Sequence, residues 1–573
     1  MKCPKCNAEI PENAWVCPEC GTAVERQSEP EPKSENETKK KSKKAWIIGG
    51  TAAAITAAAI GVGFFAANKD PKTVVMDALK GVYAAENTDP MEEVFGFKQL
   101  FKNLETAGGE MGIELAFAGS SEPEFSMFQG TGITIDTASD PVNKKFSEKL
   151  GIVYSGMDLA SIDIYGDDTY IMASVPELTS KVLTINYADN LSEQIANSPL
   201  MQENGITLTE EDKQAIENYA AYLGSIYSGE KQPFDFKALL QRYKEGSQAM
   251  GNLKEALTVT KADTSRLMYN GKEQTCTGYD VVIPKEAFIE FLRTTSRFFM
   301  EDEGLKGDLL EYIKVVLEMS QMSYAAADGM ILPAPEELLS EFWTELDTGF
   351  EDAITELERI LDGNITMKVY VTKKGQLAAM DVSCAFADSG STLVMTAKAV
   401  LEGGSYPTQN GTLAVTMTEN ADTITCNFTK SGEYTDAALN SGWKFQIEYA
   451  GETVYAEYEN AYDRATNDSA VRISFGDGSE ETGVNITLDG VVDLLEKGKN
   501  IHYTLDSLAV EDAAGIVSFE MDGALYLREL QTEITVPEGE QMDVLAASWQ
   551  DWEDLINEVM MSVYSMILGG SFL

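Results

Sequence analysis

The sequence predicts a multi-domain protein, with a small metal-stabilised module, one transmembrane helix and a large α+β domain. Three observations lead to this fold class. Two close pairs of cysteines lie within the first 20 residues, an uncharged stretch covers 45–67, and alternating apolar and polar residues dominate from Gly363 onward. Alternation with a period of two is typical of antiparallel strands with one wet and one apolar face. We therefore expect a large curled antiparallel sheet with helices packed on one face.

The four N-terminal cysteines have the spacing of a zinc site. Cys3 and Cys6 form one Cys-x-x-Cys pair, and Cys17 and Cys20 form the second. Four thiolates at this spacing can surround one Zn²⁺ tetrahedrally, which leaves no position for a catalytic water. A segment of about 25 residues buries too little apolar surface to fold alone, so the metal would supply folding free energy. We predict a ribbon with structural zinc at residues 1–24. The alternative, a redox-active pair, normally accompanies a βαβ pattern that is not found here.

The uncharged segment Ala45–Ala67 predicts a membrane-spanning helix. Its 23 residues would form a helix roughly 34 Å long, enough to cross a hydrocarbon core of about 30 Å. The preceding residues 25–44 contain no hydrophobic side chain and predict a flexible charged linker. Five lysines lie just before the segment, at 39–44, so the N-terminus is expected in the cytosol and the C-terminal domain outside.

Two other interpretations of this segment are weaker. A buried helix of a soluble domain would show a polar face, and a cleaved signal peptide would have a short leading region and small residues before the cut. We therefore expect an anchor in the lipid bilayer. Small residues recur every four positions from Gly49 to Gly61, so the anchor could also pair two copies of the chain into a homodimer.

Net charge separates the two sides of this predicted anchor. Residues 1–44 hold nine basic and eight acidic residues, whereas residues 45–573 hold 35 basic and 85 acidic ones. So acidic a chain repels nucleic acid, and we expect no nucleic-acid partner. The three other cysteines, Cys276, Cys384 and Cys426, are dispersed and are expected in the core. A Cys384–Cys426 disulfide stays open, because both residues lie on the apolar side of their strands.

The external domain divides by pattern into a mixed α/β part at 72–361 and a β-rich part with a C-terminal helix at 362–573. Helical patterns are expected near 72–82, 209–227, 234–247, 285–300, 303–324, 335–361 and 544–567. Period-two strands are expected near 113–117, 133–135, 161–174, 365–371, 380–386, 393–401, 413–417, 443–449, 454–458, 471–475, 484–488, 516–521 and 524–530. The C-terminal helix would cover part of the apolar face. Whether the two parts share one sheet stays open.

No catalytic constellation is found in the sequence. The chain has one histidine, His502, and it alternates with Ile501 and Tyr503 as a residue on a strand surface would. The acidic pair Asp167–Asp168 could bind Ca²⁺ loosely, as could 476–481, but both are ordinary hairpin turns by composition. We therefore expect no enzyme activity.

The order of these segments carries two resemblances to known families. The run CPKCNAEIPENAWVCPECG at 3–21, the charged linker, the single apolar helix and the large external domain together resemble membrane-anchored zinc-ribbon proteins of Gram-positive bacteria. The order of an early helix, strands, hairpins with Gly-Asp turns, helices and more strands resembles extracytoplasmic lipoproteins of the LolA and LppX type. The second resemblance implies an apolar cavity between a curved sheet and its helices.

These observations favour a non-enzymatic, single-pass membrane protein whose external domain binds a hydrophobic or envelope ligand. The alternative is an envelope interaction or sensory protein that docks a cytosolic partner through its ribbon. A continuous apolar cavity would favour the first, and an exposed apolar or self-complementary patch would favour the second.

Overall fold

The computed structural model describes residues 70–82, 89–227, 236–314, 335–477, 483–512 and 514–568. The chain divides into two compact units, Met1–Ala58 and Ala59–Leu573, and only the second contains described residues. The predicted ribbon at 1–24, the linker at 25–44 and the transmembrane helix at 45–67 therefore lie outside the described residues. Within the described ranges, no helix is both long enough and apolar enough to cross a membrane.

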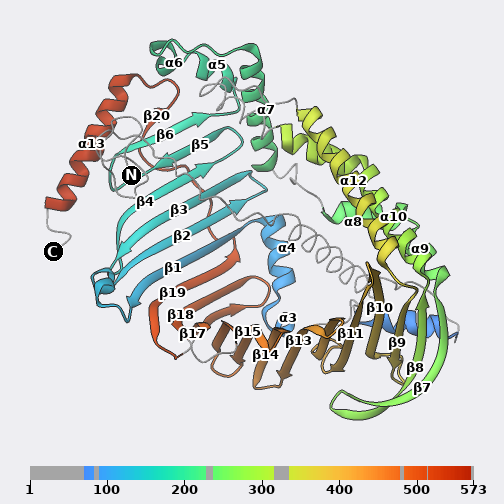
Figure 1. Cartoon of the computed structure of the whole chain (residues 1–573). Helices are drawn as coiled ribbons and strands as arrows, with labels where there is room; N and C mark the ends of the chain where they lie inside the picture. The colour runs from blue at the N-terminus through green and yellow to red at the C-terminus, as the bar shows by residue number, and fades with distance from the viewer. Residues whose placement is uncertain are drawn as a thin grey trace, which may run out of the picture. The chain divides into compact units, whose positions relative to one another are not determined.

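The second unit is built on one sheet of 20 strands (Figure 1). The strands are β1 (Gly109–Gly119), β2 (Thr131–Asp140), β3 (Lys145–Tyr154), β4 (Met157–Gly166), β5 (Tyr170–Ser174), β6 (Lys181–Asn186), β7 (Thr258–Tyr269), β8 (Lys272–Ile283), β9 (Ile365–Val371), β10 (Leu377–Asp388), β11 (Ser391–Gly403), β12 (Asn410–Glu419), β13 (Asp422–Tyr434), β14 (Ala438–Tyr449), β15 (Glu452–Asp463), β16 (Asp468–Gly476), β17 (Gly483–Glu496), β18 (Asn500–Asp512), β19 (Val517–Glu529) and β20 (Glu540–Asp543).

Strand order follows the chain over most of the sheet. Strands β7 to β19 pair with their sequence neighbours in one antiparallel meander. Strand β19 then pairs with β1, and β1 to β6 continue the sheet in sequence order. The short β20 closes the far edge by pairing with β6, in parallel. The large antiparallel sheet predicted from the alternation is therefore confirmed.

Helices are inserted between these strands. They are α2 (Pro71–Gly81), α3 (Pro90–Phe95), α4 (Phe97–Ala107), the 3-10 helix η1 (Pro123–Phe128), α5 (Leu191–Ala196), α6 (Pro199–Glu203), α7 (Glu210–Tyr227), α8 (Phe236–Gly246), α9 (Ala249–Ala256), α10 (Lys285–Glu301), α12 (Pro335–Ile360) and α13 (Trp549–Leu568). The predicted start of α7 is confirmed, since Thr209 and Asp212 form a reciprocal cap: each side chain accepts a hydrogen bond from the other's backbone N–H.

Strands from both parts of the sequence belong to one sheet, which answers the question that the sequence left open. Strand β8 pairs with β9 although 81 residues separate them in the chain, and β1 pairs with β19 across most of the domain. The β1–β19 seam is held by Glu110, which accepts hydrogen bonds from Arg528 at 2.6 Å and from the backbone N–H of Gln531 at 3.0 Å. Gly112 lies under the Tyr526 ring, where a Cβ would be 2.0 Å from a ring carbon.

Several details differ from the sequence predictions. The strands expected at 516–521 and 524–530 are one strand, β19, which passes through Gly523 at a φ of +157°, a backbone conformation that favours glycine. The hairpin of β7 and β8 and the helices α3 to α6 were not predicted. Helix α4 carries Phe97, Leu100, Phe101 and Leu104 at helical spacing, so its pattern could have been found. Cys276, Cys384 and Cys426 are free thiols. Cys384 on β10 and Cys426 on β13 lie three strands apart, roughly 14 Å, so they cannot form a disulfide.

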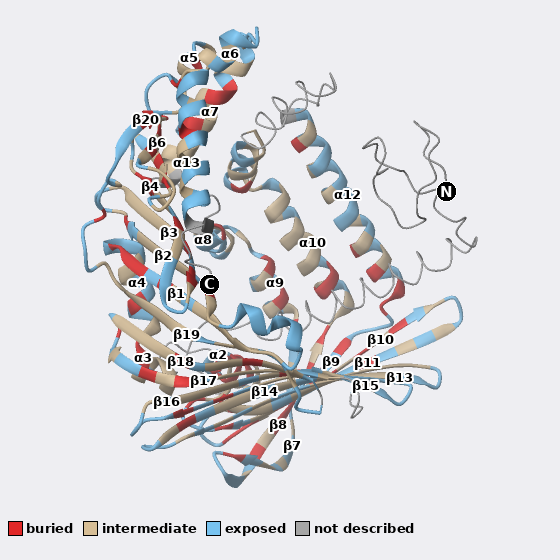
Figure 2. Cartoon of the chain, turned by 90° about the vertical axis from the view of Figure 1, so that its left-hand side faces the viewer, coloured by how far each residue is buried: buried red, intermediate tan, exposed pale blue. Residues whose placement is uncertain are grey.

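Burial is uneven along the sheet (Figure 2). The odd-numbered residues of β9, Ile365, Met367, Val369 and Val371, are all at most 5% exposed. Strands β12 and β13 contain no buried residue at all. The helices in contact with the well-buried part are α2, against β7, β9 and β10, and α12, against β10.

Candidate functional site

One face of the sheet is apolar over most of its width. The register aligns three rows of side chains across the strands: Leu413, Phe428, Phe445, Ala456, Phe475 and Val484 on β12–β17; Trp443, Tyr458, Ile473, Ile486, Val510 and Phe519 on β14–β19; and Leu525, Ile113, Ile135, Leu150 and Ile162 on β19 and β1–β4. We call this side of β11–β19 and β1–β4 the apolar face. Alternate residues of the same strands, such as Gln446 and Glu448, form the opposite, polar face.

The apolar face is closed at one end of its strands. Leu439 and Tyr462, paired on β14 and β15, are 1% and 3% exposed. Phe95 of α3 covers them, with its ring centroid 5.0 Å from that of Tyr462. Met91, Val94 and Phe97 pack around this contact. The small helices α3 and α4 therefore form a floor at the end of the strands where β13 ends and β14 begins.

At the opposite end of the same strands the apolar face is open. The side chains become more exposed toward the hairpin turns: Trp443 is 38% exposed, Tyr449 50% and Val454 58%. Ile133 and Ile152, on the other side of the β1–β19 seam, are 48% and 51% exposed. Large apolar side chains at this exposure are costly in water, and contiguous patches of them normally mark a binding surface.

The two lateral ends of the same sheet face are covered. On β9 and β10, the side chains that continue the apolar face are buried, from Met367 to Phe386. At the other edge, α13 packs Leu555, Trp552 and Val559 onto Leu183 and Met542. The predicted C-terminal helix is thus present, but among the described residues it covers only the β6–β20 edge. The uncovered surface lies between these two covered regions.

Aromatic rings form a short ladder on the apolar face. Phe428, Trp443 and Tyr458 stack across β13, β14 and β15 with centroid distances of 6.3 and 6.0 Å. Cross-strand aromatic pairs stiffen a sheet. The ladder therefore gives the uncovered region a rigid apolar surface without helices packed against it.

A polar cluster lies beside this ladder, toward the closed end. Lys430 is the one basic residue that the register places on the apolar face within the described parts of β11–β19 and β1–β4. Its Nζ donates to the Tyr406 hydroxyl at 3.1 Å, and Tyr406 donates to Asp89 at 3.0 Å. Burial, the neighbouring Tyr434 and the charge of Asp89 raise the pKa of Tyr406, so it stays a neutral donor. The cluster is a charge-balanced polar boundary to the apolar surface.

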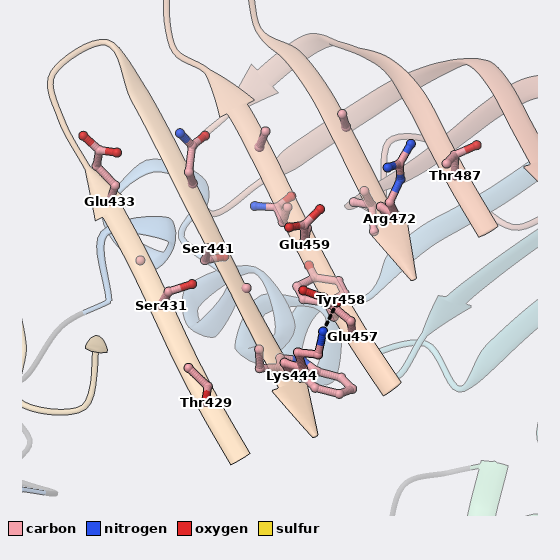
Figure 3. A pocket seen from close by; sticks show the side chains of 18 of the residues that line it. Thr429, Ser431, Glu433, Ser441, Lys444, Glu457, Tyr458, Glu459, Arg472 and Thr487 are labelled. Carbon is pink, nitrogen blue, oxygen red and sulfur yellow. Dashed lines mark hydrogen bonds and ion pairs between the residues drawn. The ribbon is translucent and has the colours of Figure 1, made fainter. Parts of the chain in front are cut away.

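The polar face carries a groove of about 750 Å³ over β13–β17 (Figure 3). Lys444 donates to Glu457 across the β14–β15 pair at 3.0 Å and lies 4.9 Å from the centroid of the Tyr455 ring. Glu433, Glu459 and Arg472 also line the groove. Its charges are mixed and exposed to water, which is typical of a solvated sheet surface.

The titratable groups singled out from the sequence are placed as follows. His502 on β18 contacts Asp493 of β17 at 2.5 Å, as an exposed cross-strand pair. Burial raises the pKa of the Cys384 thiol to about 12, which makes it a poor nucleophile. Asp167 accepts hydrogen bonds from the N–H groups of Thr169 and Tyr170, both at 2.8 Å, and so closes the predicted hairpin turn. The 476–481 loop lies largely outside the described residues.

The predicted zinc ligands Cys3, Cys6, Cys17 and Cys20 lie outside the described residues. Among the residues that the structure does describe, no group of three or more His, Cys, Asp or Glu side chains is arranged to hold a metal. The metal site of this protein is therefore predicted on the ribbon residues alone.

Comparison with known proteins identifies the N-terminal module. Residues 2–24 match the family model of the zinc-ribbon domain, a span that includes all four predicted ligands. Neither the curated proteins nor the solved structures include a match to the chain. The likeness to LolA- and LppX-type lipoproteins thus stays a prediction. The chain carries an N-terminal zinc-ribbon domain followed by a large, mostly antiparallel sheet domain with helices.

Proposed function

We propose that the protein is a single-pass membrane protein of the cell envelope whose sheet domain binds a hydrophobic ligand along its apolar face. The observation that carries this proposal is the long uncovered part of that face, with Phe445, Ile447 and Tyr449 at 37–50% exposure. Each buried Å² of apolar surface contributes about 25 cal/mol, so a long apolar chain laid across several strands would bind without a deep cavity.

The rest of the chain fits this proposal. The uncharged segment Ala45–Ala67 would hold the domain to the bilayer, with the zinc ribbon in the cytosol and the sheet domain outside. The net charge of −50 over residues 45–573 keeps a domain with so much exposed apolar surface soluble. The polar cluster around Lys430 and Tyr406 would border the apolar chain and contact the polar part of an amphiphile. No catalytic step is part of the proposal.

Paired substitutions on one strand test it. In the full chain, Phe445→Gln with Ile447→Asn places polar groups on the apolar face, whereas Gln446→Ser with Glu448→Ser changes the polar face of the same strand. The affinity for a fluorescent long-chain fatty acid should fall by tenfold or more in the first variant and stay unchanged in the second. A tenfold loss of affinity corresponds to about 1.4 kcal/mol of binding free energy. Equal binding by both variants would contradict the proposal.

The ribbon and the topology need their own test. Cys3→Ser with Cys6→Ser should abolish zinc binding, since two of four thiolate ligands are lost. An impermeant thiol reagent applied to intact cells should spare all four ribbon cysteines of the full chain. Zinc retained by the variant would show that the metal assignment is wrong, and labelling of the ribbon in intact cells would show that the orientation is wrong.

An interaction role is the second candidate, and one observation favours it. The outward side of α13 exposes Trp549, Ile556 and Met560 at 61%, 53% and 49%, and it bears no basic residue. Such a stripe could dock a second protein in the envelope. Crosslinking of the full chain through position 556 in cells should capture a partner if this candidate is correct, and none if the stripe is only solvated.

A further inference from the structure

One end of the sheet gathers exposed apolar side chains on turns from separate hairpins. Helix η1, between β1 and β2, carries Phe125, Met127 and Phe128 at 47%, 74% and 48% exposure. The β3–β4 turn leads into Met157, at 60%, and the β18–β19 turn carries Ile516, at 56%. We call these five residues the apolar rim.

Backbone pairing places the three turns side by side. Strand β1 leaves the sheet beside the start of β19, where Ser121 N–H donates to the Val517 carbonyl at 3.2 Å. The loop returns beside the β3–β4 turn, where Ser155 N–H donates to the Gly130 carbonyl at 2.7 Å. The loops that join β1 with β2 and β3 with β4 can be followed at the lower left of Figure 1. The rim is therefore one surface, although its residues are up to 391 positions apart.

The rim continues into the open end of the apolar face. Phe519 follows Ile516 by three residues and lies on that face at 36% exposure. Ile152, 51% exposed on β3, precedes the turn that leads to Met157. Exposed apolar side chains thus lie both on the turns and on the strand ends next to them, which gives an apolar molecule a short path from the rim to the apolar face.

The charges near the apolar rim indicate which kind of lipid surface the rim can contact. Residues 120–130, 155–158 and 513–516 contain no lysine or arginine, and they contain Glu122, Glu124 and Asp158. Turns are normally polar, and large apolar side chains on adjacent turns are suited to shallow insertion at the boundary between headgroups and acyl chains. Lys149 of β3 forms an ion pair with Asp158 at 3.5 Å, so the charges that remain on these turns are the carboxylates of Glu122 and Glu124. An anionic surface would repel these two carboxylates, whereas an uncharged lipid surface would not.

We propose that the apolar rim inserts into a lipid layer without net charge and passes an apolar ligand between that layer and the apolar face. The transfer step rests on the proposed function, whereas the membrane contact does not. Helix η1 contains no buried residue, so substitutions there should leave the fold intact.

Membrane contact is tested with a fluorophore on the rim. The full chain with Met127→Cys is labelled with an environment-sensitive dye. It is then mixed with phosphatidylcholine vesicles whose acyl chains carry a nitroxide quencher. The signal of the unsubstituted chain, treated in the same way, is subtracted. A Phe236→Cys chain, labelled on α8 at a position that is 66% exposed, is the control. We expect a blue shift and several-fold stronger quenching at position 127, weakened when phosphatidylglycerol is added. Equal quenching at the two positions would overturn the proposal.

Transfer is tested separately. Phe125→Ser, Met127→Ser and Phe128→Ser are combined in one full-length variant, and Ile206→Ser, Phe236→Ser and Leu240→Ser, all well exposed elsewhere, in the control. The rate at which a fluorescent phosphatidylcholine moves from vesicles to the protein should fall several-fold only in the rim variant. When the same probe is delivered from detergent, both variants should bind it equally well. Unchanged rates would overturn the transfer step. If the unsubstituted chain did not bind the probe delivered from detergent, the proposed function would be contradicted. The quenching result would still stand in that case.

Discussion

Strands β9–β10 and strands β13–β15 share one sheet and the same alternation, yet they differ in what covers them. In β9 and β10 the side chains from Met367 to Phe386 are buried, whereas on β13 to β15 Phe428, Phe445 and Val454 are 36–58% exposed. In both regions most residues on this face are apolar. The difference shows that the pattern specifies an apolar face, and that the helices inserted in the chain decide which part of this face becomes core and which part stays exposed.

Matched truncations of phenylalanine should separate the two regions most strongly. Phe386→Ala, at 2% exposure in the covered region, should lower the free energy of unfolding by about 3–5 kcal/mol, because it leaves a cavity. Phe445→Ala, at 38% exposure in the open region, should cost less than about 1 kcal/mol. Denaturant midpoints of the two full-length variants provide the measurement. Equal losses would mean that the open region is part of the core.

The seam that joins the two parts of the sequence should have the next largest effect. Glu110→Gln removes the charge that Arg528 and two backbone N–H groups bind, and should cost about 1.5–3 kcal/mol. Glu114→Gln, exposed on the same strand, is the matched control and should change little. A loss of stability in both variants alike would show that the Glu110 contacts are not what holds the seam.

This seam also predicts a pH dependence. Burial would raise the pKa of Glu110, but the hydrogen bonds from Gln531 and Arg528 outweigh burial and lower it below its usual range. The stabilisation is then fully present above the unfolded-state pKa of about 4.3 and is lost as the pH falls through the lower folded-state pKa. The stability of Glu110→Gln should depend less on pH in the acid range than that of the unsubstituted chain.

Thiol reactivity should show the smallest difference between the covered region, β9–β10, and the open region, β13–β15. Each of these regions has one cysteine on the same face of the sheet. Cys384 is 4% exposed, and burial raises its pKa to about 12, whereas Cys426 lies in the open region and is half-buried. At pH 8 a small aromatic disulfide should modify Cys426 faster than Cys384, with Cys384→Ser and Cys426→Ser identifying the sites. Faster reaction of Cys384 would contradict the assignment of covered and open regions.

The sequence predicted the sheet and its long elements, because these depend on local periodicity. The strands around Val369, Val382 and Phe445 alternate over seven or more residues, and α7 carries its own cap at Thr209. The zinc ribbon was predicted from cysteine spacing, and the family match at residues 2–24 supports it. These features are encoded within one segment of chain each.

Pairing between distant segments could not be predicted in this way. Nothing in the local pattern of β1 indicates that Ile113 lies beside Leu525, and that pairing is what makes the apolar face continuous. The apolar rim was missed for the same reason, since Met157 and Ile516 lie at or just before the starts of separate strands that only the fold brings to the same end of the sheet. The exposed PEFSMF run at 123–128 is the one local signal that could have indicated it.

Binding of a hydrophobic ligand to the apolar face can be tested on the protein as it is isolated from the cells that make it. The full chain is purified under mild conditions and extracted with organic solvent, and the extract is identified by mass spectrometry. We expect a lipid or another long apolar molecule at near-stoichiometric amounts, lost from the variant with Phe445→Gln and Ile447→Asn and kept in the variant with Gln446→Ser and Glu448→Ser. A folded chain that yields no such molecule, or equal amounts from both variants, would show that the apolar face does not carry a ligand.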